Sequence, residues 1–447
     1  MFELHVLPAE PVQQEPGHYL IYRPRAGIAF VGNRAMADLA LSASRDELTA
    51  DDLAGRACDF LDRIGFLESD PPVPIPPALE FRPATAVLLM TNDCQLRCTY
   101  CYAAAGSAPR EELDPHMAHV VIDHVCDTAV QQGLDYFELS LHGGGEPTRA
   151  WGALKHCVDY ARGRPLPAQI TMTSNGVWSP GQLEWITENV DAATISVDGA
   201  PDTQNRQRPF ESGQGSAATV LRNLAELDAR EFPYAIRMTA TPPWDHLAKD
   251  VQFLFESTQC QSIHVEPAFN TSRGGHPEPD EAAAQAFSQA FVEAFLVASS
   301  AGRHLAYSGA SVNAVAATHC SAPYESLIVT TRGSLVTCYE VTSPSHPLAG
   351  ISTIGRVAGG TLTIDDARRL TLLDKLAERR DRLCQGCWCA TTCAGDCYAR
   401  AFDSGERGHL SFGRRCQMNR DVTKGVLLAL IATGAGVWRR GDWEAIA

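Results

Sequence analysis

Residues 85–101, TAVLLMTNDCQLRCTYC, place a short apolar run directly before a loop that carries three cysteines. The run Thr85–Met90 begins shortly after a proline and ends at the polar residues Thr91 and Asn92, a pattern typical of a buried strand. Five similar runs follow, with helical patterns such as His116–Gln131 and Gln182–Asn189 between them: Tyr136–Leu141, Gln169–Thr173, Ala193–Val197, Tyr234–Thr239 and Ser262–Glu266. Six βα alternations predict an α/β fold with a parallel sheet, a partial (β/α)6 TIM-like barrel rather than a full barrel.

Unusual residues come directly after four of these strands. Cys94 follows the first, Gly143–Pro147 the second, Ser174–Gly176 the third and Asp198–Gly199 the fourth. In barrels of parallel strands the active site lies at the carboxyl ends of the strands. The sequence therefore predicts that these four segments meet in one site.

The first loop has the spacing Cys-x3-Cys-x2-Cys, with thiols at Cys94, Cys98 and Cys101. Three thiolates this close in the chain can ligate three irons of a 4Fe–4S cluster and leave the fourth iron open. A zinc knuckle is the alternative, but tetrahedral zinc needs a fourth ligand, and no other Cys or His lies beside the loop. We predict an iron–sulfur site whose open iron can bind a further ligand.

The composition excludes several classes of protein. Of 447 residues, 45% are hydrophobic and 20% are charged, which is the balance of a folded globular chain. The net charge of −16 argues against a nucleic-acid binder. No signal peptide is evident, and the apolar run Val426–Trp438 is shorter than the roughly 20 residues that span a bilayer. We expect a cytoplasmic protein, in which 15 cysteines indicate metal binding rather than disulfides.

The chain resembles the radical S-adenosylmethionine (radical SAM) enzymes beyond its cysteine loop. Residues 142–148, HGGGEPT, resemble the Gly-Gly-Glu-Pro motif of that family, and residues 173–176 and 196–199 match two further strand-end motifs. Residues 204–209, QNRQRP, lack the His-Asp pair with which this segment begins in relatives. The resemblance implies that SAM binds the open iron and contacts Tyr100, Gly144, Gly145, Glu146, Asn175, Ser196, Arg208 and Arg237. It also implies cleavage of SAM to a 5′-deoxyadenosyl radical, which takes a hydrogen atom from the substrate.

A second cysteine pattern resembles the SPASM domain, which holds two auxiliary 4Fe–4S clusters in relatives. Its seven cysteines, with Gly333 between the first two, are Cys320, Cys338, Cys384, Cys387, Cys393, Cys397 and Cys416. The resemblance implies an outer cluster on Cys384, Cys387, Cys393 and Cys416, and an inner cluster on Cys320, Cys338 and Cys397. Zinc is again the alternative, and Cys389 is predicted not to be a ligand.

The inner cluster departs from the SPASM pattern. Fully ligated relatives have an eighth cysteine six residues before the first, where this chain has Ala314. Either the inner cluster has an open iron, or a neighbour such as His319 completes its ligands. With the cluster of the first loop, the expected total is three 4Fe–4S clusters.

The chain divides into five predicted parts. Residues 1–70 combine the strands His18–Tyr22 and Gly27–Val31 with helical patterns at Asn33–Leu41 and Leu48–Ile64, and resemble a winged-helix module. Residues 71–83 are proline-rich and form a linker. Residues 84–305 are the radical SAM core, ending with the helix Glu281–Ser299. Residues 306–425 form the auxiliary-cluster domain, and residues 426–447 form a C-terminal tail.

These resemblances imply an enzyme that modifies peptides. We expect a maturase that abstracts a hydrogen atom from a ribosomally made precursor peptide and installs a carbon–carbon or carbon–heteroatom cross-link. The N-terminal module resembles the leader-recognition element of such maturases, which adds a leader to a sheet edge as an extra strand. A generic winged helix or a cap on the barrel is the alternative. The expected partners are the precursor peptide with its leader and a flavodoxin- or ferredoxin-like reductant, without nucleic acid or membrane.

Two other functions remain open at this stage. One is an anaerobic sulfatase-maturating enzyme that forms formylglycine, although Tyr339-Glu340 stands where those relatives have an Asp base. The other is a non-catalytic iron–sulfur electron carrier, which would not explain the strand-end motifs. Glu340 and Tyr339 are candidates for the catalytic group that accepts a proton, by their position next to Cys338 alone.

Overall fold

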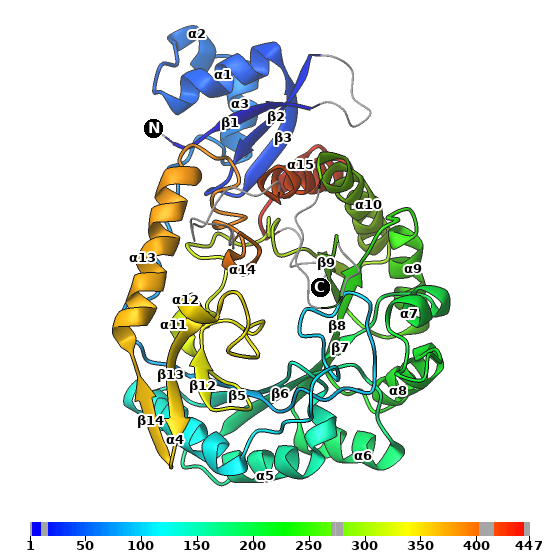
Figure 1. The fold of residues 1–447 in the computed structure, drawn as a ribbon. Coiled ribbons are helices and arrows are strands. Elements are labelled where there is room, and N and C mark those ends of the chain that lie inside the picture. Colours follow the sequence, from blue (N-terminus) through cyan, green and yellow to red (C-terminus); the bar gives the residue numbers. More distant parts are fainter. Residues whose placement is uncertain (1, 10–16, 270–272, 274–279, 402–414, 442–447) are drawn as a thin grey trace.

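A curved sheet of eleven strands forms the body of the molecule (Figure 1). The computed structural model describes residues 2–9, 17–269, 273, 280–401 and 415–441. Eight neighbouring strands of this sheet run parallel: β10 (His304–Ala306), β9 (Ser262–Pro267), β8 (Tyr234–Ala240), β7 (Ala192–Ser196), β6 (Ala168–Ser174), β5 (Phe137–His142), β4 (Thr85–Leu89) and β11 (Ser326–Val329). Antiparallel pairing then adds β12 (Ser334–Val336), β13 (Thr353–Ala358) and β14 (Thr361–Ile364).

The six predicted strands are β4 to β9, and the predicted α/β partial barrel is confirmed. The sheet order begins at β10 and ends at β14, so the described strands do not close into a barrel. The parallel strands β10 and β11 were not predicted. They have only three and four residues, too few to show an alternation of apolar and polar positions.

Helices cover the outer face of the parallel strands (Figure 1). Val121 and Val125 of the first of them are buried in the same core as Leu139 and Leu141 of β5. Because side chains alternate along a strand, the neighbouring His142 faces the opposite, inner side of the curved sheet. These helices are α4 (Pro115–Gln131), η1 (Pro147–Ala150), α5 (Trp151–Arg162), α6 (Pro180–Asn189), α7 (Pro201–Gln207), α8 (Ala217–Ala229), α9 (Leu247–Ser257) and α10 (Glu281–Ser300).

The N-terminal region forms a second, antiparallel sheet with the order β1-β2-β3-β15. Its elements are β1 (His5–Pro8), β2 (His18–Arg23), β3 (Ile28–Asn33), α1 (Arg34–Ser44), α2 (Ala50–Leu53) and α3 (Arg56–Arg63), with β15 (Val437–Arg439) from the far end of the chain. The single helix predicted over Leu48–Ile64 is wrong. It is divided at Gly55, whose extended backbone (φ −89°, ψ 145°) begins α3, because glycine is a poor helix former.

The C-terminal region contains α11 (Ala322–Glu325), α12 (Ala349–Ser352), α13 (Asp366–Leu383), α14 (Tyr398–Ala401) and α15 (Arg415–Thr433). The helix α15 crosses the boundary predicted between residues 425 and 426. It lies so close to α10 that a Cβ at Gly425 would be 2.3 Å from Val292. Residues 426–441 therefore do not form a separate tail. Residues 402–414 of the predicted auxiliary domain and 442–447 of the predicted tail lie outside the described residues.

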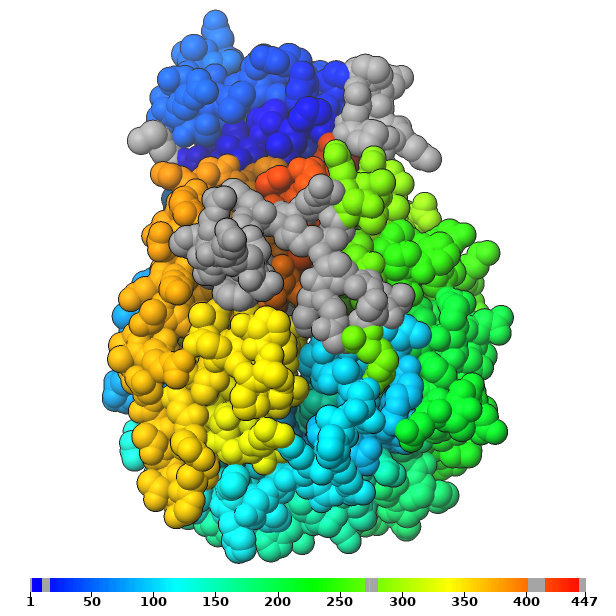
Figure 2. Space-filling model, in the orientation of Figure 1, coloured from blue at the N-terminus to red at the C-terminus, as the bar shows by residue number. Residues whose placement is uncertain are grey.

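The two ends of the chain meet at the N-terminal sheet. The strand β15 pairs with β3, and Trp438 is buried, with its ring centroid 6.3 Å from that of Tyr22. In Figure 2 the N-terminal region (blue) sits directly on the C-terminal region (orange and red). The described residues contain no helix that is long and apolar enough to span a membrane.

Candidate functional site

The cysteine loop after β4 brings three thiols together. Cys98 is buried, and Cys94 and Cys101 are partly buried. Burial and the nearby charges of Glu146 and Cys98 raise the pKa of Cys94 to about 12, and burial raises the pKa of Cys98 to about 11. Two donors point at the Cys94 sulfur, the Leu96 amide at 3.4 Å and the Asn175 side-chain amide at 3.7 Å. Buried thiols with raised pKa values become thiolates only when a bound cation or hydrogen-bond donors stabilise the negative charge.

The segment after α7 runs alongside this loop and holds its backbone. The Thr99 amide donates to the Gln207 carbonyl at 2.9 Å, and the Arg97 amide donates to the Pro209 carbonyl at 2.8 Å. The Glu211 amide donates to the Gln95 carbonyl at 3.0 Å. The predicted segment 204–209 is thus a direct neighbour of the cysteines, although it lacks the family's His-Asp pair.

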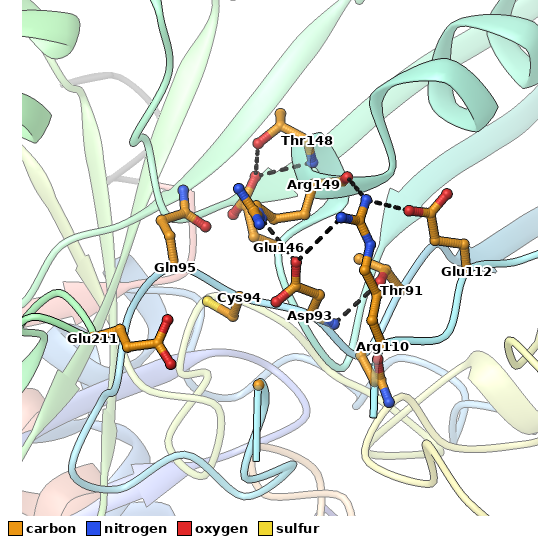
Figure 3. A network of polar contacts seen from close by, with 12 residues as sticks. Thr91, Asp93, Cys94, Gln95, Arg110, Glu112, Glu146, Thr148, Arg149 and Glu211 are labelled. Carbon is orange, nitrogen blue, oxygen red and sulfur yellow. Dashed lines mark hydrogen bonds and ion pairs between the residues drawn. The ribbon is translucent and has the colours of Figure 1, made fainter. Parts of the chain in front are cut away.

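The glycine-rich turn after β5 packs against the start of the cysteine loop. The Gly145 amide donates to the Thr91 carbonyl and the Glu146 amide donates to the Asp93 carbonyl, both at 2.8 Å. A Cβ at Gly145 would lie 2.0 Å from the Asp93 oxygen, so only glycine fits there. At Gly144 a Cβ would lie 2.9 Å from the Thr342 side chain. Figure 3 shows this junction, with Arg149 donating to Asp93 at 2.9 Å.

Glu146 is only 1% exposed and links the ends of two strands. One carboxylate oxygen accepts from the Ser174 and Thr148 hydroxyls, at 2.7 and 2.8 Å, and the other accepts from the Asn175 amide at 2.8 Å. Burial raises the pKa of Glu146, and these hydrogen bonds oppose that effect. Both oxygens are thus used within the chain, and Glu146 positions Asn175 next to Cys94.

Tyr100 and Arg208 meet in a buried network that also contains Asp198. The Tyr100 hydroxyl donates to Asp198 at 2.6 Å and accepts from the Arg208 guanidinium at 2.7 Å. Burial raises the pKa of Asp198, and the charge of Arg208 opposes this. The sequence marked Asp198 as part of a strand-end motif but not as a site residue. The sequence feature that could have identified Asp198 is its position directly after an apolar strand.

Ser196 and Arg237 are neighbours on adjacent parallel strands, in register with each other. Arg237 lies 4.0 Å from Glu266 on the next strand. Burial alone would raise the pKa of Glu266, but His264, Arg237 and Arg415 hold it well below its usual range. Glu266 therefore joins the inner face of the sheet to α15, and the sequence patterns did not identify it.

The outer set of cysteines lines one pocket. Its wall contains Cys384, Cys387, Cys393 and Cys416, together with Cys389 and Arg379. The Asn419 side-chain amide donates to the Cys393 sulfur at 3.2 Å. Burial raises the pKa of Cys393 to about 12.

The inner cysteines all pack against one buried cluster, which contains Val87 and Leu89 of β4; they are Cys320, Cys338 and Cys397. Burial raises the pKa of Cys338, and Glu340, Cys397 and Cys320 raise it further. His319 contacts the Cys393 carbonyl through Nδ1 at 3.1 Å, so this edge of its ring faces the outer loop rather than the inner thiols.

Tyr339 and Glu340 directly follow Cys338 of the inner set in the chain. Glu340 pairs with Arg400 at 2.7 Å, and the Tyr339 ring lies 5.2 Å from that of His142. Burial and the charges of Glu340 and Cys101 raise the pKa of Tyr102. The structure thus brings Glu340 near both thiol groups.

All fifteen cysteines are free thiols, and ten of them lie in the three sets. Within the described ranges, no three His, Cys, Asp or Glu side chains are arranged to hold a single metal ion. A group of thiols without carboxylate or imidazole partners suits iron–sulfur chemistry by ligand type. The ligand type of these thiols thus suits iron–sulfur clusters, and the number of clusters stays a prediction.

The comparisons with known proteins agree with this geometry. Residues 88–254 match the family model of the radical SAM superfamily. The sporulation killing factor maturation protein SkfB of Bacillus subtilis is 25% identical over 179 residues, which are 38% of this chain and 39% of SkfB. The uncharacterized protein MJ0907 of Methanocaldococcus jannaschii is 25% identical over 158 residues, 35% of this chain and 52% of that protein. The chain thus spans about half or less of the length of these curated relatives.

Among solved structures, anSMEcpe with bound AdoMet superposes with a TM-score of 0.63 and 15% identity. The match covers 78% of this chain and 98% of anSMEcpe, and at this identity it shows the fold alone. The family match falls on the strands and loops that carry the first cysteine set, the glycine-rich turn and Asp198. Residues 88–254 are therefore a domain of the radical SAM superfamily.

Proposed function

We propose that this protein is a radical SAM maturase that cross-links a ribosomally made precursor peptide. The observation that carries the proposal is the meeting of the cysteine loop with the glycine-rich turn and Asn175, beside two further thiol sets. SkfB, which matches the core, is described as a maturation protein. When bound, a reduced 4Fe–4S cluster and SAM supply a 5′-deoxyadenosyl radical that abstracts a hydrogen atom from the peptide.

The chain's own residues have separate parts in this proposal. Cys94, Cys98 and Cys101 hold the cluster, and Asn175 donates toward the Cys94 sulfur. Gly144 and Gly145 bring backbone close to the loop, where SAM would bind, and Glu146 fixes Asn175. Ser196, Arg208 and Arg237 supply polar and cationic contacts for SAM. The buried core behind the strands keeps water from this side of the site.

Cross-link formation removes two hydrogen atoms from the peptide. The 5′-deoxyadenosyl radical would take one of them as a hydrogen atom, and the second must leave as a proton and one electron. The inner and outer cysteine sets would hold two auxiliary clusters for this purpose, and a flavodoxin- or ferredoxin-like protein would reduce the first cluster. Glu340 is the candidate proton acceptor because it lies near Cys338 and Tyr102.

The proposal is tested by co-expressing the protein with a candidate precursor peptide and fragmenting the product by mass spectrometry. Loss of two hydrogens, with fragments that stay joined between two residues, supports the cross-link. A product aldehyde that reacts with a hydrazide reagent would instead support formylglycine formation. Failure of the reduced protein to convert SAM to 5′-deoxyadenosine would support the electron carrier.

Substitution Cys416→Ala is expected to remove about four irons per chain and to abolish peptide modification. Cleavage of SAM should continue without modification, because Cys416 is in the outer pocket and not in the first cysteine loop. Iron analysis and 5′-deoxyadenosine assays measure both effects. The control is Cys389→Ala, which lies in the same pocket but is predicted not to be a ligand. An equal loss of iron in both variants contradicts the ligand assignment.

We further propose that the N-terminal sheet binds the leader at the outer edge of β1. The outer side of β3 is already paired with β15. The Ala9 amide bonds to the His18 carbonyl, so in this antiparallel register Val6 and Pro8 direct their backbone groups outward. Pro8 has no N–H, which leaves the Val6 N–H and the carbonyls of both residues for a leader strand.

Substitution Val6→Pro is expected to weaken leader binding several-fold, since one hydrogen bond contributes about 1 kcal/mol. The β1–β2 ladder does not use the Val6 N–H, so iron content and SAM cleavage should stay unchanged. Fluorescence anisotropy with a labelled leader peptide measures the affinity. Deleting residues 1–70 is a poorer test, because Leu20 and Tyr22 belong to the same core as Trp438. Unchanged affinity in a fully loaded Val6→Pro protein contradicts binding at this edge.

A further inference from the structure

Asp198 connects three separate parts of the site. It follows β7 and is 2% exposed. One carboxylate oxygen accepts from the Tyr100 hydroxyl at 2.6 Å, and the other accepts from the Thr239 amide at 3.0 Å. The cysteine loop is thereby tied to the carboxyl ends of two neighbouring strands, β7 and β8.

The Tyr100 hydroxyl is shared between two charged groups. Tyr100 stands between Cys98 and Cys101 in the chain, and its oxygen also accepts from the Arg208 guanidinium at 2.7 Å. The Arg208 guanidinium lies 3.8 Å from the Asp198 carboxylate. Asp198 and Arg208 are buried and Tyr100 is half-buried, which makes the opposite charges of Asp198 and Arg208 strongly dependent on each other.

The Arg208 side chain can donate a further hydrogen bond. Its Nε is buried, and within the part of the chain that the structure describes it has no hydrogen-bond partner. A guanidinium held at one nitrogen by Tyr100, with Nε unused, can donate to a carboxylate. The methionine carboxylate of SAM is the ligand of that type expected beside Cys98.

We propose that Asp198 is a positioning residue for SAM, acting through Tyr100 and Arg208. Its carboxylate holds the Tyr100 hydroxyl, which fixes the segment between Cys98 and Cys101 and orients the Arg208 guanidinium. A preformed guanidinium binds a carboxylate more tightly because less side-chain freedom is lost on binding. The inference rests on the proposed binding of SAM by this domain.

The chain offers a matched control in Asp250. This carboxylate is 3% exposed and accepts from the Ala200 amide at 2.8 Å and the Thr203 hydroxyl at 2.9 Å. Its hydrogen bonds thus reach the start of α7 rather than the cysteine loop. Replacing either Asp by Asn removes a buried negative charge from the same region of the barrel, but only Asp198 contacts Tyr100.

The experiment measures SAM binding to the reconstituted full-length protein by equilibrium dialysis, together with iron content. In Asp198→Asn, we expect the iron content of the wild type and a dissociation constant for SAM raised about tenfold. The change that SAM causes in the EPR spectrum of the reduced cluster should weaken in parallel. Tyr100→Phe should have the same effect, and the double variant should be no worse than the more affected single variant, because both act through one network.

Asp250→Asn should bind SAM as the wild type does. Wild-type affinity in Asp198→Asn, or an equal loss in Asp250→Asn, overturns the positioning role. If Asp198→Asn does not load iron, Tyr100→Phe decides, since it keeps the carboxylate, and wild-type affinity there overturns the proposal. A wild-type protein that does not bind SAM at all would reject the proposed function instead, so the two failures are distinct.

Discussion

Replacement of Cys94, Cys98 and Cys101 together by Ala is expected to remove about four irons per chain and to abolish cleavage of SAM. The other two thiol sets, on the inner and outer loops, should keep about eight irons of an expected total of about twelve. The reason is that each set is gathered by its own segments: the outer pocket is lined by residues between Arg379 and Gly395 and by Cys416, Asn419 and Arg420, and none of them belongs to the first loop. Anaerobic reconstitution, iron analysis and detection of 5′-deoxyadenosine check the result.

The matched control replaces three buried cysteines outside the sets, Cys126, Cys157 and Cys260. Each belongs to the apolar core, so this variant should be less stable but should retain iron and SAM cleavage. Wild-type protein with only about four irons would reject the two auxiliary clusters. Cleavage of SAM by the Cys94, Cys98 and Cys101 variant would reject the first loop as the cluster site.

Substitution Gly145→Ala is expected to lower SAM cleavage by about a hundredfold or more, since displacing a reacting group by about 1 Å can have that effect. The added Cβ would lie 2.0 Å from the Asp93 carbonyl oxygen, and neither atom can move away by a side-chain rotation, because the oxygen belongs to the backbone and the Cβ is fixed to the backbone. Relief of this overlap must move the glycine-rich turn away from the cysteine loop. It would also break the hydrogen bonds from Gly145 to Thr91 and from Glu146 to Asp93.

Gly152→Ala is the control for this substitution. Gly152 lies in α5, and a Cβ there would meet nothing within 4 Å. Alanine favours a helix over glycine by about 1 kcal/mol, so this variant should be as active as the wild type and slightly more stable. Steady-state production of 5′-deoxyadenosine and thermal unfolding compare the two. Wild-type activity in Gly145→Ala would show that the contact between turn and loop is not needed.

The agreement of six predicted strands with β4 to β9 has a local cause. Each of these strands has five to seven residues, enough for its apolar pattern to be read from neighbouring positions. The cysteine spacings are also local, because Cys94, Cys98 and Cys101 lie on one short loop. Residues at the carboxyl ends of parallel strands must lie near each other once the sheet forms, so the glycine-rich turn and Asn175 could be placed at the site in advance.

Other features depend on contacts between residues that are far apart in the chain. The hydroxyl of Tyr100 meets the carboxylate of Asp198 across 98 residues, and no periodicity relates the two. The sequence patterns did not identify Glu266, because its role depends on the charges of Arg237 and Arg415, which lie on two other elements. A strand-end carboxylate has no defined role until its partners are known.

The amino-acid sequence by itself determined the α/β class, the order of the main strands and the residues of the first cysteine loop. Each of these follows from patterns over fewer than twenty residues, in which hydrophobic burial and ligand spacing act locally. Only the tertiary structure decided that β15 closes the edge of β3. A three-residue strand has no detectable pattern of its own, and β15 is stable because Trp438 is buried beside Tyr22, which lies more than 400 residues earlier in the chain.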